Sequence, residues 1–440
     1  MNTYETTRNR SVNKHFLNRR SELKAINVFS YFDLRKIIPI FISVTIYLFA
    51  FRGNIGGIFA IVTSLMLAVS FIKSGSFKKN NVLLYLWAAL LATFALIVYL
   101  FRAIAPSFYM FTSYVFACSI LFFNSEINKE ALFKYVFFFS CVVLASIYFQ
   151  FFWFSGYSFF ARFFFPANVY EMIVNRYYSG YCSGITSEVT YAAMFSVFGA
   201  FYSPIILRNK KRIIVCIVFL VGLFLTGKKA SILFAFLTLI GLYLIKSKSI
   251  IKVIKVLLSF AVALFFLFIL FDYWKNIPGL SRMAVFVENL SSDADLNSLT
   301  SGRVVIYQRA LDLWKENKLF GIGWLNFREL GSYGDSIYTT WFDNFDVHNC
   351  YLQVLVETGY VGAICFCVIA FITIIYMTRI ARLTKERFKL VAFCFALYFL
   401  LYSFTEPALY SGSQHLLFFS SLCLLFSNER SLCQTKNPLQ

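Results

Sequence analysis

The chain has 440 residues, of which 59% are hydrophobic, 20% aromatic and 14% charged. Soluble domains carry about a quarter charged residues, so this composition excludes an ordinary soluble protein and indicates an integral membrane protein. Lys and Arg number 41 against 21 Asp and Glu, but no DNA- or RNA-binding module interrupts the apolar segments, which argues against nucleic acid as a partner.

The chain begins with a basic leader, residues 1–36, which has no long apolar run and no signal-peptide pattern. We expect this leader to lie in the cytoplasm. A bilayer core requires about 20 mostly apolar residues per helix. On this criterion the sequence predicts twelve membrane spans, at 37–51, 56–72, 82–101, 108–123, 133–154, 190–207, 212–226, 230–245, 251–271, 354–377, 388–404 and 412–427. Twelve spans place both termini inside, with 428–440 as a cytoplasmic tail, and the predicted fold class is an all-α integral membrane protein.

The connections between the predicted spans alternate in charge, as the positive-inside rule requires. Lys and Arg crowd the connections near 73–79, 208–212, 246–255 and 379–389. The exception is the connection after the fourth span, where Glu126 and Glu130 make the charge almost neutral. The other connections then lie outside the cytoplasm, including two long ones at 155–189 and 272–353.

The large extracytoplasmic loop, 272–353, separates spans one to nine, within 37–271, from spans ten to twelve, within 354–427. A loop of this length without structure of its own would be unusual. We expect an amphipathic helix at 302–317, lying over the membrane domain, and a turn at Gly321 and Gly323 that ends it. The stripe expected to face the protein consists of Val304, Tyr307, Leu311 and Trp314.

His348 stands where this long loop meets an apolar run that begins at Val354. Asp346 precedes the histidine and Asn349 follows it. Histidine side chains in general titrate near pH 6.5, so such a residue can take a proton from a sugar hydroxyl or orient that hydroxyl. The alternative is an interfacial histidine that caps the N-terminus of the next helix.

Basic residues on the predicted outer side form a second candidate group, because the positive-inside rule predicts few of them there. The ones that matter most are Arg176 in the first long loop, Lys228 and Lys229 in a short connection, and Arg303 in the second long loop. A cluster of Arg and Lys suits a pyrophosphate, and attraction to anionic lipid headgroups is the alternative. Glu188 and Glu406 could orient these cations or cap helices.

Several motifs are absent from the sequence. There is no Walker A motif, no His/Cys cluster and no GxSxG nucleophile elbow. The one DxD spacing, Asp293 and Asp295, leaves a metal-dependent sugar transferase as an alternative. We therefore expect no ATP hydrolysis, no metal ion and no cofactor.

A longer pattern surrounds His348. His348 and Asn349 are followed by nine residues and then Gly359, and by two more residues and then Gly362. This pattern resembles that of the bacterial O-antigen ligase and O-antigen or capsule polymerase superfamily. The segments 301–303 and 320–323, with Trp314 between them, are similar to the stretch that precedes the histidine in that family.

The resemblance implies a GT-C-like, metal-independent glycosyltransferase that acts on a glycan linked to undecaprenyl pyrophosphate. Basic residues would hold the pyrophosphate, with the histidine activating or positioning the acceptor hydroxyl. Arg303 matches the family pattern by position. Arg176, upstream of Gly184 and Glu188, is similar to an arginine-to-glycine-to-glutamate pattern of some polymerases. Lys229 departs from the family, which usually has Ser-Arg in this turn.

The leading hypothesis is a polymerase of lipid-linked polysaccharide repeat units in the bacterial cytoplasmic (inner) membrane, with its active site facing the periplasm or cell exterior. The partners implied are the undecaprenyl-pyrophosphate oligosaccharide, an acceptor glycan, membrane lipids, and a chain-length regulator and flippase. One alternative is an O-antigen ligase, which transfers a completed glycan to lipid A core or another acceptor. A polysaccharide transporter or flippase is a further alternative, although transporters place ionisable residues near the bilayer midplane.

Overall fold

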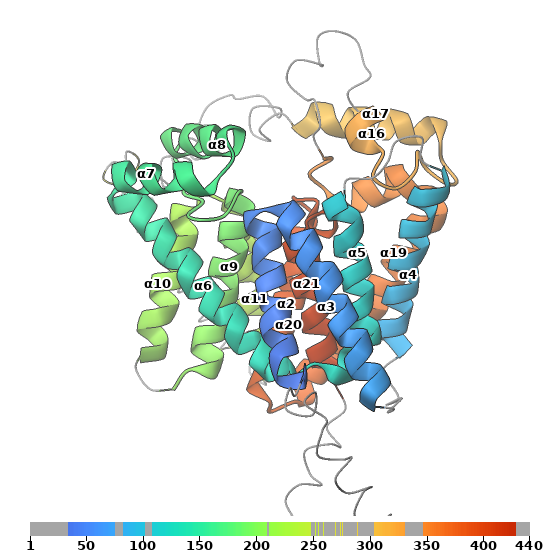
Figure 1. Cartoon of the computed structure of the whole chain (residues 1–440), viewed down its shortest axis with the longest axis horizontal. Coiled ribbons are helices and arrows are strands. Elements are labelled where there is room, and N and C mark those ends of the chain that lie inside the picture. The colour runs from blue at the N-terminus through green and yellow to red at the C-terminus, as the bar shows by residue number, and fades with distance from the viewer. Residues whose placement is uncertain are drawn as a thin grey trace, which may run out of the picture.

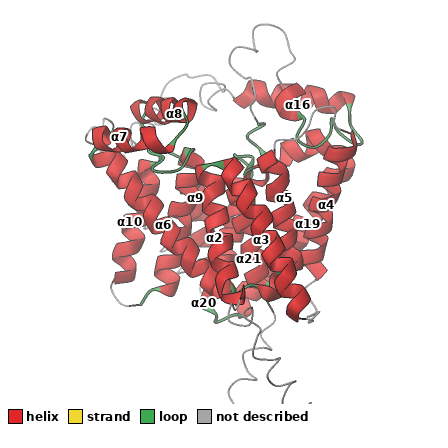
Figure 2. Cartoon of the chain, in the orientation of Figure 1, coloured by secondary structure: helices red, strands yellow, loops and turns green. Residues whose placement is uncertain are grey.

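The computed structural model describes residues 34–74, 82–101, 108–208, 211–247, 303–330 and 346–427, with a few single residues between 251 and 288. Within these ranges every regular element is a helix (Figure 2), which confirms the all-α prediction. Nearly all of the leader 1–36, most of the span predicted at 251–271 and the tail 428–440 lie outside the described residues.

Each predicted span outside 251–271 coincides with a helix. These helices are α2 (Leu34–Phe51), α3 (Gly53–Ser74), α4 (Val82–Phe101), α5 (Phe108–Phe122), α6 (Lys129–Phe152), α9 (Val189–Ile206), α10 (Lys211–Leu225), α11 (Lys229–Lys246), α19 (Cys350–Leu383), α20 (Arg387–Tyr402) and α21 (Gly412–Leu425). Among the described helices, six are long and apolar enough to cross a membrane, namely α2, α3, α6, α9, α11 and α19. The chain is thus a multi-pass membrane protein, and the count of twelve spans stays a prediction.

Helix α21 lies at the centre of the bundle (Figure 1), and all 14 of its residues are buried. A helix that is shielded on all sides packs inside other helices, because none of its faces needs to meet solvent or lipid. Helix α20 packs against it and is itself largely buried. The connection between them, which contains the short helix η3 (Ala408–Tyr410), is therefore held at the middle of one end of the bundle.

The other end carries the basic connections and the short helix η2 (Asn124–Glu126). Here the structure explains why the connection after the fourth span is almost neutral. The buried Glu126 carboxylate accepts hydrogen bonds from Arg35 at 2.9 Å, from Ser70 at 2.8 Å and from Ser74 at 3.0 Å. Burial would raise the pKa of Glu126, but these donors lower it below the ordinary value. The acidic residue therefore ties α2 and α3 to η2, which follows α5.

Two pairs of helices cover the end of the bundle opposite the basic connections (Figure 1). Helices α7 (Phe154–Phe164) and α8 (Ala167–Tyr178) occupy most of the 155–189 connection, while α16 (Arg303–Glu316) and α17 (Phe327–Leu330) lie across the other side. The amphipathic helix predicted at 302–317 is thus confirmed as α16. Its predicted stripe is wrong at Leu311, which is 37% exposed. The buried face consists of Ile306, Ala310 and Leu313, with Tyr307 and Trp314 packed beside it.

Helix α19 is broken at Gly359, whose φ of 61° and ψ of −165° are not helical. The chain after α16 passes through this break. Ile322 and Gly323 donate backbone hydrogen bonds to the carbonyls of Val356 and Glu357, while Tyr360 donates to Lys318 at 2.8 Å. The approach is so close that a Cβ on Gly359 would lie 2.3 Å from the backbone of Leu319. Gly321 and Gly359 therefore allow the backbone that follows α16 to pack directly against α19.

Candidate functional site

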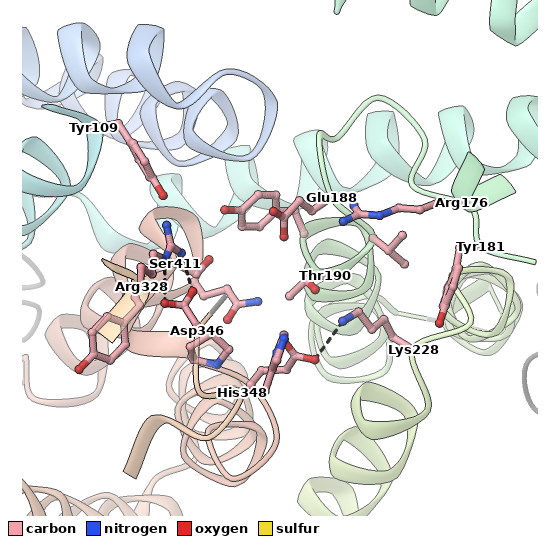
Figure 3. Close-up of a pocket in the computed structure, with 16 residues that line it drawn as sticks. Tyr109, Arg176, Tyr181, Glu188, Thr190, Lys228, Arg328, Asp346, His348 and Ser411 are labelled. Atoms are coloured by element: carbon pink, nitrogen blue, oxygen red, sulfur yellow. Dashed lines mark hydrogen bonds and ion pairs between the residues drawn. The ribbon is translucent and has the colours of Figure 1, made fainter. Parts of the chain in front are cut away.

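A cavity of about 430 Å³ opens at the end of the bundle that carries α7, α8 and α16. Its walls come from the starts of α5, α9 and α19, the α10–α11 turn, helices α8 and α17, and the α20–α21 connection. The ionisable residues that line it, apart from the tyrosines, are Arg176, Glu188, Lys228, Arg328, Asp346, His348 and Glu406. Residues that are far apart in the sequence therefore meet in one polar space (Figure 3).

Glu406, in the α20–α21 connection, is the carboxylate on which several of the basic groups converge. Its Oε1 is 2.9 Å from Lys228 Nζ and 3.2 Å from Arg303 Nη2, and its Oε2 is 3.6 Å from His348 Nδ1. Arg303 also donates to the Thr405 carbonyl at 2.7 Å. Burial would raise the pKa of Glu406, but Lys228, His348 and Arg303 outweigh it and hold that pKa well below the usual range. Glu406 carries one negative charge, and Lys228 and Arg303 carry two positive charges. The net charge of these three side chains is therefore positive.

His348 has a backbone φ of 55°, in the left-handed region that residues other than glycine rarely adopt. Such conformations persist where the surrounding structure holds them, and they concentrate at functional sites. The helix cap is the next residue, because Asn349 Oδ1 accepts a hydrogen bond from Leu352 N at 3.0 Å. His348 therefore does not cap α19. Its ring faces Glu406 and lines the cavity.

Lys228 owes its position to a tight turn between α10 and α11. Gly227 has a φ of 67°, and the side chain of Thr226 accepts a hydrogen bond from Lys228 N at 3.4 Å. Lys228 is the N-terminal flanking residue of α11 and projects into the cavity. Lys229 begins the helix one residue later and is not among the residues that line the cavity. The structure thus brings the first lysine of the pair, and not the second, to Glu406.

Arg176, in the last turn of α8, and Glu188, which directly precedes α9, stand at the two ends of the segment that joins these helices, and both line the cavity. Backbone hydrogen bonds fix this segment at two points. Cys182 N donates to Leu225 O at 3.1 Å, beside the α10–α11 turn, and Ser187 N donates to Ala50 O at 2.9 Å, at the end of α2. The arginine from α8 points towards the centre of the cavity in Figure 3. Both residues of the polymerase-like pattern thus face the same space as His348.

A second ion pair stands on the other side of the cavity. Arg328 Nε lies 2.8 Å from Asp346 Oδ1, two residues before His348. Gln353 donates to the same Asp346 oxygen at 3.1 Å and to Glu357 at 3.3 Å. Glu357 in turn accepts from Leu325 N at 2.8 Å, in the turn that leads to Arg328. These bonds hold the turn before α17 against the residues that directly precede His348.

Figure 3 shows how the labelled groups divide. Arg176, Tyr181 and Lys228 come from one side, and Tyr109, Arg328, Asp346 and Ser411 from the other, with His348 between the two sets. Within the described part of the chain, no group of three or more His, Cys, Asp or Glu side chains is arranged to hold a metal ion.

Comparison with known proteins adds one finding. Residues 214–367 match the family model described as O-antigen ligase. This match supports the resemblance of the chain to the O-antigen ligase and polymerase superfamily. The matched range is about a third of the chain and contains Lys228, Arg303 and His348, while Arg176 and Glu406 lie outside it. No curated protein matches the chain.

The residues predicted from the sequence fall into two groups, those that line the cavity and those that lie behind its wall. His348, Arg176, Lys228 and Glu188 line the cavity, and Arg303 meets it through Glu406. The other predicted supporting residues lie behind it: Asn349 caps α19, while Gly359 and Gly362 stand at and just after its break.

Sequence reasoning missed two residues that hold the site together, Gln353 and Glu357. They are spaced four apart at the start of an otherwise apolar helix, which places both on one face. Two buried polar side chains at that spacing are a signal that could have identified them. Asp346 and Glu406 were noticed in the sequence, but nothing there indicated that Asp346 binds Arg328 or that Glu406 gathers the cations.

Proposed function

We propose that this protein is a polymerase of lipid-linked polysaccharide repeat units, transferring glycan from undecaprenyl pyrophosphate to a sugar hydroxyl of the acceptor. The observation that carries the proposal is the meeting of His348 with Lys228 and Arg303 around a single buried carboxylate, Glu406. A base beside a net positive site suits a reaction in which an alcohol is deprotonated and a pyrophosphate departs. The basic connections lie at the opposite end of the bundle, which supports an outer-facing site.

In the proposed reaction, the acceptor oxygen attacks the anomeric carbon of the donor, and the bond from that carbon to the pyrophosphate oxygen breaks. The electron pair of this bond leaves with the lipid pyrophosphate. The hydroxyl proton passes to Nε2 of His348, while Nδ1 faces Glu406. The carboxylate would hold the ring in place and stabilise the imidazolium that forms. A single displacement of this kind inverts the anomeric configuration, and no metal ion is needed in it.

The leaving pyrophosphate would be held by Lys228, Arg303 and Arg176. Arginine binds phosphate with two parallel hydrogen bonds, and lysine acts as a point charge. Lys229, one residue into α11, would contribute to the field around the turn rather than by direct contact. Anionic lipid headgroups would be attracted by the same charges, but a headgroup alone gives no reason for a histidine beside Glu406.

The test replaces His348 by Ala in purified, reconstituted protein given a defined undecaprenyl-pyrophosphate oligosaccharide. We expect the wild type to make polymer and the variant to make none while keeping its thermal midpoint, with products measured by mass spectrometry. Full-length polymer from a folded His348→Ala protein would refute the proposed role of the histidine.

The second candidate is a ligase, and the description of the matched family favours it. Arg176 and Glu188 in the cavity favour the polymerase, because that pair resembles a polymerase pattern. A ladder of products from one repeat-unit substrate supports polymerisation, whereas a single transfer to lipid A core supports ligation. Uptake of glycan into liposomes that survives loss of His348 and Arg303 would instead support a transporter.

A further inference from the structure

The cavity contains a buried amide that the proposed reaction does not use. Gln414, in the first turn of α21, is 3% exposed and lines the cavity. Neither its Oε1 nor its Nε2 has a hydrogen-bond partner among the described residues. It therefore combines burial, a position at the cavity wall and two unused hydrogen-bonding atoms.

A buried amide without partners destabilises a fold, because it has lost its bonds to water and gained none in return. The paired amides of this chain show the contrast. Asn124 donates to the Leu121 carbonyl at 3.0 Å, and Gln353 uses both ends of its side chain. An apolar residue would fill the site of Gln414 without this penalty. The structure thus has an amide placed where a molecule in the cavity, a ligand or the water that it displaces, would satisfy it.

The surroundings of Gln414 indicate the class of ligand. A primary amide presents a donor and an acceptor side by side, so two neighbouring hydroxyls of a sugar ring can bond to it at once. Four tyrosines, Tyr109, Tyr181, Tyr191 and Tyr410, also line the cavity, and aromatic side chains are common at sites that bind the apolar side of a small molecule. We propose that Gln414 determines specificity in an acceptor subsite, where it binds adjacent hydroxyls of the acceptor's terminal sugar.

The assignment to the acceptor follows from the division of charge and rests on the proposed function. Lys228 and Arg176 stand on one side of His348, where a pyrophosphate would bind (Figure 3). Ser411, one helical turn before Gln414, stands on the other side with Tyr109. The arginine labelled on that side, Arg328, is neutralised by its ion pair with Asp346. In a single displacement the attacking hydroxyl approaches opposite the leaving group, so the acceptor sugar belongs on the side away from those cations.

The test is Gln414→Met, which keeps the length of the side chain and removes both hydrogen-bonding atoms. Transfer is measured with labelled lipid-linked donor and lipid-free oligosaccharide acceptor, and the concentration of each is varied in turn. We expect the acceptor KM to rise roughly tenfold or more, with the donor KM and the kcat within about twofold of wild type. The thermal midpoint should be unchanged or higher, because an unpaired amide has been removed.

The matched control is Asn124→Leu, which removes a buried but paired amide at the opposite end of the bundle. It should lower the thermal midpoint and leave the acceptor KM unchanged. If Gln414→Met does not fold, Gln414→Asn keeps the amide but withdraws it by one methylene, and it should give a smaller rise in acceptor KM.

Saturation-transfer NMR of the same lipid-free oligosaccharide gives a readout that does not depend on turnover. Binding to the wild type and its loss in the folded Gln414→Met protein support the subsite even if no transfer occurs, in which case only the proposed function fails. An unchanged acceptor KM and unchanged binding in the folded variant overturn the inference. So does a loss of thermal midpoint with no change in acceptor KM, because that identifies a structural amide.

Discussion

Glu406→Gln is the most informative single change, because it removes one charge from the centre of the site while keeping its shape. The carboxylate is 3.6 Å from His348 Nδ1, and its side chain is 6% exposed. At an effective dielectric constant of about 20, two unit charges at this separation attract by about 4 to 5 kcal/mol. Because the His348 side chain is 27% exposed, solvent screening reduces this to about 2 to 3 kcal/mol. If that energy stabilises the imidazolium in the transition state, kcat falls roughly 30- to 150-fold.

The assay is single-turnover transfer from a lipid-pyrophosphate donor, with the thermal midpoint measured on the same preparation. Glu126→Gln is the matched control, since it also removes a buried carboxylate from an arginine, but at the other end of the bundle. It should lower the thermal midpoint without changing the rate of the folded protein. The reasoning is refuted if Glu406→Gln keeps its rate within threefold while His348→Ala is inactive.

Three further outcomes follow from the same contacts. Gly359→Ala should lower the thermal midpoint severely, because the new Cβ meets backbone at a positive φ, whereas Gly241→Ala meets only the end of a leucine side chain and should be close to neutral in a melting experiment. Lys228→Met should raise the donor KM roughly tenfold, and Lys229→Met should raise it less; equal effects in a titration with donor would contradict the assignment. Glu406 has a lowered pKa in the folded protein, so its contribution to stability is complete above the unfolded value of about 4.3 and is lost as the pH falls below it. The thermal midpoint should therefore fall on acidification, and Glu406→Gln should flatten that dependence in a pH series.

The helices were largely predictable from the sequence, because lipid imposes a strong constraint on composition and length. The predicted ranges 82–101 and 108–123 begin at the same residues as α4 and α5. The buried face of α16 was harder to predict. Consecutive residues differ by about 100° around a helix, so a small error in the orientation of the helix changes which residues are buried. The predicted stripe included Leu311, and the buried face is instead the row through Ile306, Ala310 and Leu313.

The site residues that belong to a short sequence motif could be predicted. Those that only the fold brings together could not. His348 stands in a compact motif, so its importance could be inferred. Glu406 is 58 positions away, and only the antiparallel packing of α19, α20 and α21 brings it beside His348. The choice between Lys228 and Lys229 depends on the residue at which α11 begins, and a shift by one position redirects the side chain. The residues next to each position in the sequence indicate neither the pairing of Glu406 with His348 nor the first residue of α11.

The break in α19 also bears on where His348 lies relative to the hydrocarbon core of the membrane. After Gly359, residues 360–383 extend roughly 36 Å at about 1.5 Å per residue, enough to cross a hydrocarbon core of about 30 Å. The nine residues before the break lie outside this stretch, next to the segment that follows α16. Bond formation at His348 would then take place above the acyl chains, in the aqueous layer. A growing polysaccharide could leave sideways into water, and the protein would need no pore for its product.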